Sequence, residues 1–224
     1  ILSLPFTGIL IVFLYRVSNN ADDKGTNMVI SSIHSSTRIP FRMAPLIFIS
    51  TVLTHLCGGS AGREGAAIQL GGSIANRLGK LCKLNENDQR IIIMCGMSAG
   101  FSALFGTPMA AAIFSMEVVS VGIMHYSALV PCVISSLIAH GIATSAGASA
   151  ETFIIEEMPI FNVGTAIRIS VLAILCALVS IVFCVMLHQA EHLYKKYFKN
   201  PFIRIFIGGC FVIVLTICVG DQRY

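Results

Sequence analysis

Tryptophan is absent from the 224-residue sequence, and charged residues make up only 12% of it. Soluble domains carry about 25% charged residues. This composition, with 55% hydrophobic residues, therefore excludes an ordinary soluble protein and predicts an integral membrane protein. Without tryptophan, Tyr and Phe must supply the aromatic residues at the membrane surface. The net charge of +4 lies mostly in short loops, so we expect it to set orientation and not to bind nucleic acid.

The usual signals of metal and disulfide chemistry are also missing. The eight cysteines lie almost all within apolar runs and form no CxxC pair. We therefore expect them to be small buried hydrophobic residues, and we expect no metal and no cofactor. The chain starts within the apolar run at Ile1 and ends at Tyr224, shortly after the last apolar segment, and we expect it to be a piece of a longer protein.

The apolar segments predict an all-α, polytopic membrane protein with re-entrant half-helices. A spanning helix needs about 20 mostly apolar residues, whereas segments of about 10 to 14 are typical of re-entrant pieces. The candidate spans are residues 1–18, 126–147, 163–190 and 202–220. Residues 43–57 form a further apolar segment. The short pieces interrupted by Gly or Pro are 65–80, 91–104 and 109–122. Short, interrupted segments of this kind indicate a transporter's binding site.

Basic residues predict the orientation of the chain. Lys and Arg cluster in the segment 77–90, which includes a polar loop predicted over 80–90, and again in the segment 195–204. The positive-inside rule places both on the cytoplasmic side. The segment around Glu151, Glu156 and Glu157 carries no Lys or Arg, which suits the opposite side.

The run Gly62-Arg63-Glu64-Gly65 places an ionisable pair in a sequence of membrane character. Charges at membrane depth are costly and are by default a functional hypothesis. We predict a helix starting near Ala66, with its unpaired N–H groups and positive dipole end facing Glu64. The ionised carboxylate would occupy an anion site there, and the protonated form would leave it and carry a proton. The alternative is a helix-capping Glu64, with Arg63 reaching toward the membrane surface.

Two further segments are candidates. Gly25-Thr26-Asn27-Met28 precedes an apolar helix and offers free N–H groups with a hydroxyl or an amide to an anion, although an ordinary capped helix explains it equally well. A Gly- and Ala-rich stretch leads through Pro108, which suits a first helical turn, to Glu117. Glu117 is either functional or an interfacial carboxylate at a helix end.

These motifs together resemble the chloride channel and transporter (CLC) family. The resemblance rests on GREG after a Gly-rich segment and on a proline-opened, Ala-rich helix that ends in Glu about fifty residues later. In that family GREGP carries the gating glutamate, which Glu64 matches, and the earlier GSGIP motif corresponds to residues 25–29. The resemblance implies a homodimer with one pore per subunit. It also implies that residues 1–224 form a partial transmembrane domain, comprising a first inverted repeat without its start and the beginning of the second.

Departures from the family pattern indicate a subgroup. Ala66 replaces the motif's proline, residues 25–29 have lost the serine that contacts chloride, and Val118 stands where many exchangers have a second acidic residue. These departures are similar to the bacterial branch that exports fluoride in exchange for protons. The resemblance implies a multi-pass protein of the bacterial inner membrane that moves fluoride, or chloride as the runner-up.

In this interpretation the anion pocket is shaped by the residues around Glu64, namely Gly62, Arg63, Gly65 and the amides of Ala66 and Ala67. The inner approach to the pocket is lined by the earlier motif, Gly25, Thr26, Asn27 and Met28. Two alternatives remain. One is a passive anion channel of the same fold. The other is an intramembrane zinc protease, because His188, Glu191 and His192 form an H-x-x-E-H motif. A solvated helix end beside the lysines explains that motif better.

Overall fold

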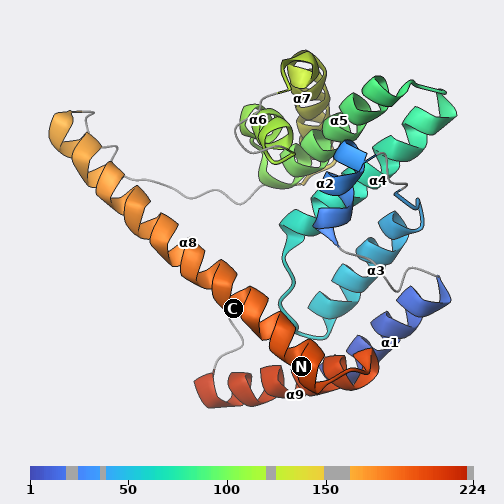
Figure 1. The fold of residues 1–224 in the computed structure, drawn as a ribbon, viewed down its shortest axis with the longest axis vertical. Coiled ribbons are helices and arrows are strands. Elements are labelled where there is room, and N and C mark those ends of the chain that lie inside the picture. The colour runs from blue at the N-terminus through green and yellow to red at the C-terminus, as the bar shows by residue number, and fades with distance from the viewer. Residues whose placement is uncertain (19–24, 36–38, 120–124, 149–161, 221–224) are drawn as a thin grey trace.

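The computed structural model describes residues 1–18, 25–35, 39–119, 125–148 and 162–220. Within these ranges the chain forms nine α-helices and one short 3₁₀ helix, and no strand (Figure 1). The elements are α1 (Leu4–Val17), α2 (Thr26–Ser35), α3 (Met43–Leu56), α4 (Arg63–Leu81), α5 (Glu86–Phe105), α6 (Pro108–Glu117), η1 (Tyr126–Ala128), α7 (Leu129–Ser145), α8 (Val163–Tyr197) and α9 (Pro201–Val219).

The hydrophobic core lies among α2 to α7, and α5 is its central helix. α5 packs against α4 on one side and against α6 and α7 on another. Methionine fills much of this interior, since its flexible thioether suits the irregular gaps between short helices. The buried members of the core are Val29, Ile33, Ile39, Met43, Ile47, Ile68, Ile93, Met94, Met97, Ala112, Met116, Val119, Ala128 and Cys132.

Glycines allow the backbones of α4 and α5 to touch. A Cβ added to Gly71 would lie 2.1 Å from the carbonyl oxygen of Gly96, and one added to Gly96 would lie 2.3 Å from the carbonyl oxygen of Gly71. One turn further along α5, a Cβ at Gly100 would lie 2.6 Å from the carbonyl oxygen of Ala67. Small residues four apart permit this close approach between membrane helices. The crossing therefore fixes α4, and with it the start of α4, against the core.

Hydrogen bonds between side chain and backbone join α5 to α7. Ser98 Oγ donates to the carbonyl of Cys132 at 3.1 Å, and Ser102 Oγ donates to the carbonyl of Ser136 at 2.8 Å. Ser135 Oγ donates in the opposite direction, to the carbonyl of Cys95, at 3.0 Å. Serine hydroxyls at such interfaces hold membrane helices together where no hydrophobic driving force does so.

A buried asparagine ties α4 to the segment that leads into α3. Asn76 Nδ2 donates to the carbonyl of Ile39 at 2.9 Å. Gln89 Nε2 of α5 in turn donates to the Asn76 carbonyl at 2.9 Å and to its Oδ1 at 2.8 Å. Because a buried amide without partners is costly, these bonds fix the relative positions of three chain segments.

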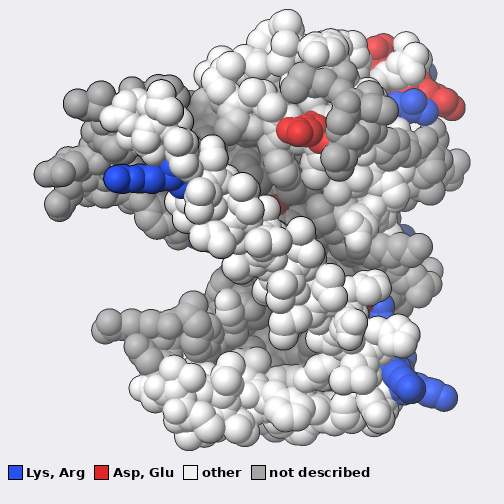
Figure 2. Space-filling view, turned by 60° about the vertical axis from the view of Figure 1, so that its left-hand side comes forward, with Lys and Arg blue, Asp and Glu red and all other residues white. Residues whose placement is uncertain are grey.

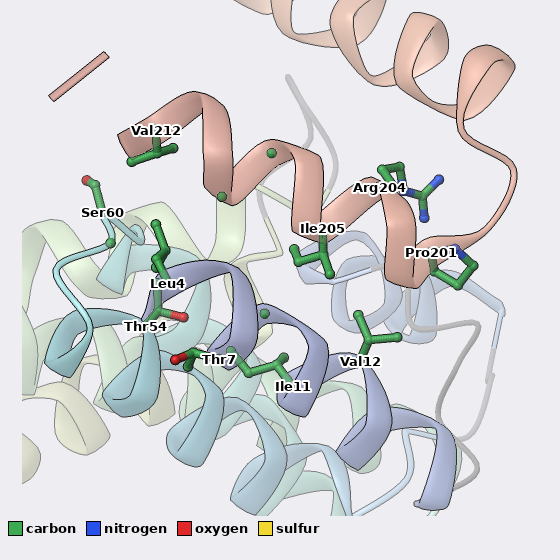
Figure 3. Close-up of a pocket in the computed structure, with 14 residues that line it drawn as sticks. Leu4, Thr7, Ile11, Val12, Thr54, Ser60, Pro201, Arg204, Ile205 and Val212 are labelled. Carbon is green, nitrogen blue, oxygen red and sulfur yellow. The ribbon is translucent and has the colours of Figure 1, made fainter. Parts of the chain in front are cut away.

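The first and last helices, α1 and α9, lie side by side (Figure 3). Gly8 of α1 leaves room for Ile205, whose Cγ1 would be 2.6 Å from a Cβ at position 8, and Gly209 of α9 leaves room for the Pro5 backbone. A cavity of about 310 Å³ lies between the two helices, with Pro201 and Arg204 at one end and Ser60 at the other (Figure 3).

Three helices among the described residues are long and apolar enough to cross a membrane: Tyr126–Ser145, Val163–Tyr197 and Pro201–Val219. Leu4–Val17 and Met43–Leu56 are apolar but shorter. None of the residues of α8 is buried, and this helix extends away from the core (Figure 1). On the face shown in Figure 2, the charged side chains of the described residues lie in a few separate places among uncharged ones. Such a surface suits a lipid environment.

The structure corrects several predicted boundaries, among them the two that follow. The polar loop predicted over 80–90 is wrong, because α4 continues to Leu81 and α5 begins at Glu86. Asn85 caps α5 by accepting a hydrogen bond from the backbone N–H of Asp88 at 2.9 Å. The span predicted over 163–190 is too short, because α8 continues to Tyr197. At about 1.5 Å per residue, 35 residues extend for roughly 52 Å, well beyond a hydrocarbon core of about 30 Å. The acidic segment containing Glu151, Glu156 and Glu157 lies outside the described residues.

Candidate functional site: two helix N-termini beside a carboxylate

The start of α4 lies three residues earlier than the sequence predicts. The helix begins at Arg63, with Gly62 as an extended N-cap residue at φ −64° and ψ 131°. The prediction of a start near Ala66 is therefore wrong, and Glu64 lies inside the first turn instead of before it. An acidic residue is favoured in the first turn because it interacts with the positive end of the helix dipole, and this preference moves the start forward.

The Glu64 carboxylate lies beside the N-cap residue. A Cβ at Gly62 would lie 2.9 Å from Glu64 Oε2, so a side chain at position 62 would compete with the carboxylate for space. Gly62 forms no side-chain cap of its own. The carboxylate of Glu64 is therefore the acidic group at the start of α4, and Glu64 is an exposed residue.

The start of α2 lies against the first turn of α4. α2 begins at Thr26, immediately after Gly25, whose φ of +62° favours glycine. A Cβ at Gly65 would lie 2.9 Å from Thr26 Oγ1, so Gly65 is needed for this close approach. The two candidate segments found in the sequence, 39 residues apart from Thr26 to Gly65, thus meet in space.

Gln69, which was not among the predicted site residues, joins these two helix starts. Gln69 Nε2 donates a hydrogen bond to Thr26 Oγ1 at 3.1 Å, and it would lie 3.5 Å from a Cβ at Gly25. The available signal was a single amide in the apolar and small run 66–72. A polar side chain in such a run requires a partner, and here the partner is the threonine of the other helix.

The other predicted site residues occupy different surroundings. Asn27 is exposed, whereas the Met28 and Ala66 side chains pack against the hydrophobic core, so only their backbones can face a ligand. Ala67 and Arg63 line a largely apolar cavity of about 740 Å³ between α3, α4 and α5, together with His55.

This geometry suits a small anion. Two helix N-termini bring the positive ends of their dipoles to one place, where the Gln69 amide donates to the Thr26 hydroxyl. No three His, Cys, Asp or Glu side chains of the described ranges lie close enough to hold a metal ion. The Glu191 carboxylate of the H-x-x-E-H motif forms an ion pair with Lys195 instead.

The fold is that of an α-helical membrane protein in which two helix N-termini meet beside an acidic side chain. The chain belongs to the voltage gated chloride channel family, whose model matches residues 7–222. Members of this family are channels or transporters in the membrane and not enzymes, which removes the metalloprotease alternative. The resemblance inferred from the GREG motif is therefore confirmed.

Similar proteins include a chloride/fluoride channel protein of Pseudomonas syringae pv. tomato, 34% identical over 222 residues, which are 99% of this chain and 49% of that protein. The H(+)/Cl(−) exchange transporter ClcA of Vibrio cholerae is 24% identical over 184 residues, 78% of this chain and 39% of its own length. The crystal structure of a CLC-type fluoride/proton antiporter superimposes with a TM-score of 0.93 at 34% identity, covering 100% of this chain and 57% of that one. The chain thus spans about half the length of the Pseudomonas relative.

Proposed function

We propose that the intact protein exchanges a halide, fluoride in preference to chloride, for protons, and that Glu64 is its gate. The position of the Glu64 carboxylate beside Gly62, at the positive end of α4, carries this proposal. An ionised carboxylate there occupies the place that an anion would take. A protonated carboxylate loses its attraction to the helix end, so it leaves the site and takes a proton with it.

The groups around Glu64 and those at the start of α2 would contact the halide at two successive places. The backbones of Gly62, Gly65, Ala66 and Ala67 and the charge of Arg63 would shape the pocket on the α4 side. Thr26, with Gln69 behind it and with the backbones of Gly25, Asn27 and Met28, would form the inner approach. Fluoride is small and accepts hydrogen bonds strongly, so hydroxyl and amide donors at this point favour it over chloride.

Several observations support fluoride and an exchanger. Of the similar proteins at 34% identity, one is named a chloride/fluoride channel protein, which supports fluoride, and the other is a CLC-type fluoride/proton antiporter, which supports fluoride and exchange. Ala66 and Val118 stand where the resemblance shows proline and a second acidic residue in other exchangers. We further propose that the protein is a multi-pass homodimer of a bacterial plasma membrane. In this proposal residues 1–224 form its first repeat without its start, followed by the beginning of the second.

Exchange can be tested with the intact protein in liposomes under an imposed pH step. We expect fluoride to move against its own gradient, and we expect Glu64→Gln to abolish the associated proton movement. Glu86→Gln is the matched control, because Glu86 also lies exposed in the first turn of a helix, but in α5 after a polar connection. That variant should exchange ions as the wild type does.

Each outcome bears on one part of the proposal. Proton coupling that persists in Glu64→Gln excludes Glu64 as the proton carrier. Fluoride that only runs down its gradient, whatever the pH step, indicates a passive channel. Exchange of chloride but not fluoride by the wild type leaves the gate in place and overturns the selectivity.

A further inference from the structure

Two cysteine thiols meet where α5 packs against α7. The Sγ atom of Cys95 in α5 lies 3.9 Å from the Sγ atom of Cys132 in α7, although the two residues are 37 positions apart in the sequence. The two helices lie side by side (Figure 1). Both cysteines are free thiols. The packing of α5 on α7 therefore brings together two groups that can form a covalent bond with each other.

The backbones of the two helices are also held close together around this pair. Ser135 Oγ of α7 donates to the Cys95 carbonyl at 3.0 Å, and Ser98 Oγ of α5 donates to the Cys132 carbonyl at 3.1 Å. Because a serine hydroxyl is only two bonds from its Cα, such bonds form only where backbones approach closely. A disulfide needs Cα atoms about 4.4–6.8 Å apart and sulfur atoms about 2.05 Å apart. The two sulfur atoms must therefore approach by roughly 1.9 Å, which is within the range of side-chain rotation.

The two thiols differ in burial. Cys132 has no exposed surface, whereas Cys95 is half-buried. A small oxidant can therefore reach Cys95 first, and Cys132 lies in contact with it as the second thiol. Redox-sensitive cysteines combine an accessible thiol with a resolving thiol in this way. The alternative is that both cysteines are small packing residues whose buried thiols are inert.

From this geometry we infer that Cys95 and Cys132 form a modification site, at which a small peroxide produces a disulfide between α5 and α7. The Cys95 sulfur attacks one oxygen of hydrogen peroxide and becomes a sulfenic acid, while the O–O bond breaks and the other oxygen leaves as water. The Cys132 sulfur then attacks the sulfenic sulfur, and the hydroxyl group leaves with the Cys132 proton as a second water. The two thiols lose two electrons and two protons, and the peroxide is reduced to two molecules of water.

The disulfide would strengthen the support of α4. Cys95 directly precedes Gly96, whose carbonyl oxygen faces Gly71 of α4 where the two helices cross. A covalent bond from Cys95 to α7 would therefore hold α5, and through it α4, more firmly. Neither chemical step requires ion transport, so the disulfide can be tested apart from the proposed function.

The test is treatment of the intact protein in detergent with hydrogen peroxide. The remaining free thiols are alkylated, and the digested protein is searched by mass spectrometry for linked peptides, before and after reduction with dithiothreitol. The variants are Cys132→Ser and Cys95→Ser, so that one remains if the other does not fold. Cys210→Ser is the matched control, because Cys210 is also a half-buried free thiol in an apolar helix, but in α9.

We expect a peptide linked through Cys95 and Cys132 in the wild type and in Cys210→Ser, and dithiothreitol should remove it. Oxidation should raise the Tm of both proteins by roughly 5 °C, because the link constrains the unfolded chain. In Cys132→Ser no such link should form, and Cys95 should remain a sulfenic acid that a dimedone probe captures. In Cys95→Ser the buried Cys132 should stay reduced.

Two results would overturn this inference. Oxidation of Cys210 in a wild type whose Cys95 and Cys132 stay reduced would show that the pair has a packing role alone. A Cys95 sulfenic acid that persists in the wild type would show that Cys132 does not resolve it. A linked protein with an unchanged Tm would overturn the supporting role of the disulfide.

Discussion

Replacing Gly71 with alanine should force α4 away from α5. The new Cβ would lie 2.1 Å from the carbonyl oxygen of Gly96, whereas ordinary contact begins at 3.4 Å. The helices must therefore part by the difference, roughly 1.3 Å, because the obstacle is backbone and no flexible side chain can move aside. Overpacking of this kind typically costs about 1–3 kcal/mol, and here we expect the upper part of that range.

The measurement is the free energy of unfolding of the purified protein in detergent, followed through its helicity. Gly208→Ala is the control, since a Cβ there meets nothing within 4 Å and alanine favours the helix by up to about 1 kcal/mol. Because Glu64 lies two turns before Gly71 on the same helix, ion exchange should also weaken in Gly71→Ala. A Gly71→Ala variant that unfolds within about 0.5 kcal/mol of the wild type would show that the backbones do not touch as described.

Two further predictions concern the polar contacts of α4, α5 and α7. Ser102→Ala should lower the unfolding free energy by about 0.5–1.5 kcal/mol through loss of the bond to the Ser136 carbonyl, whereas Ser170→Ala, whose hydroxyl bonds only within exposed α8, should change it little. Asn76→Ala should cost about 1–3 kcal/mol and more than Gln89→Ala, because Asn76 is buried and bridges two segments. Equal stability of the members of either pair would contradict the argument.

Hydropathy located the helices but placed several of their ends wrongly. The apolar run that predicts a helix from residue 91 ignores the polar first turn of α5, although Asn85 and Glu86 carry a capping signal. The same bias cut α8 at residue 190, because its last two turns are charged and aromatic but still helical. Long polar side chains at a membrane surface keep their charged heads in water while the helix continues, so composition alone cannot mark its end.

The candidate site also has parts that the sequence predicts and parts that depend on the tertiary fold. The glycines beside Thr26 and Glu64 pointed to two helix starts, since only a residue without a Cβ permits such approaches. The contact between those starts depends on the crossing of α4 and α5 and on the packing of α2, which no local pattern contains. Gln69 and Thr26 belong to different helices, and their proximity arises only from the tertiary fold.

The pairing of α1 with α9 has a consequence for biogenesis. Pro5 and Gly209 touch, yet the ribosome makes them roughly two hundred residues apart, so at about 5–20 residues per second α1 waits on the order of 10–40 s for its partner. During that interval the 14-residue apolar helix α1 must stay in the bilayer without the Ile205 side chain that packs against Gly8 in the folded protein. Lipids or the insertion machinery must therefore occupy the place of Ile205 beside α1 until α9 has been made.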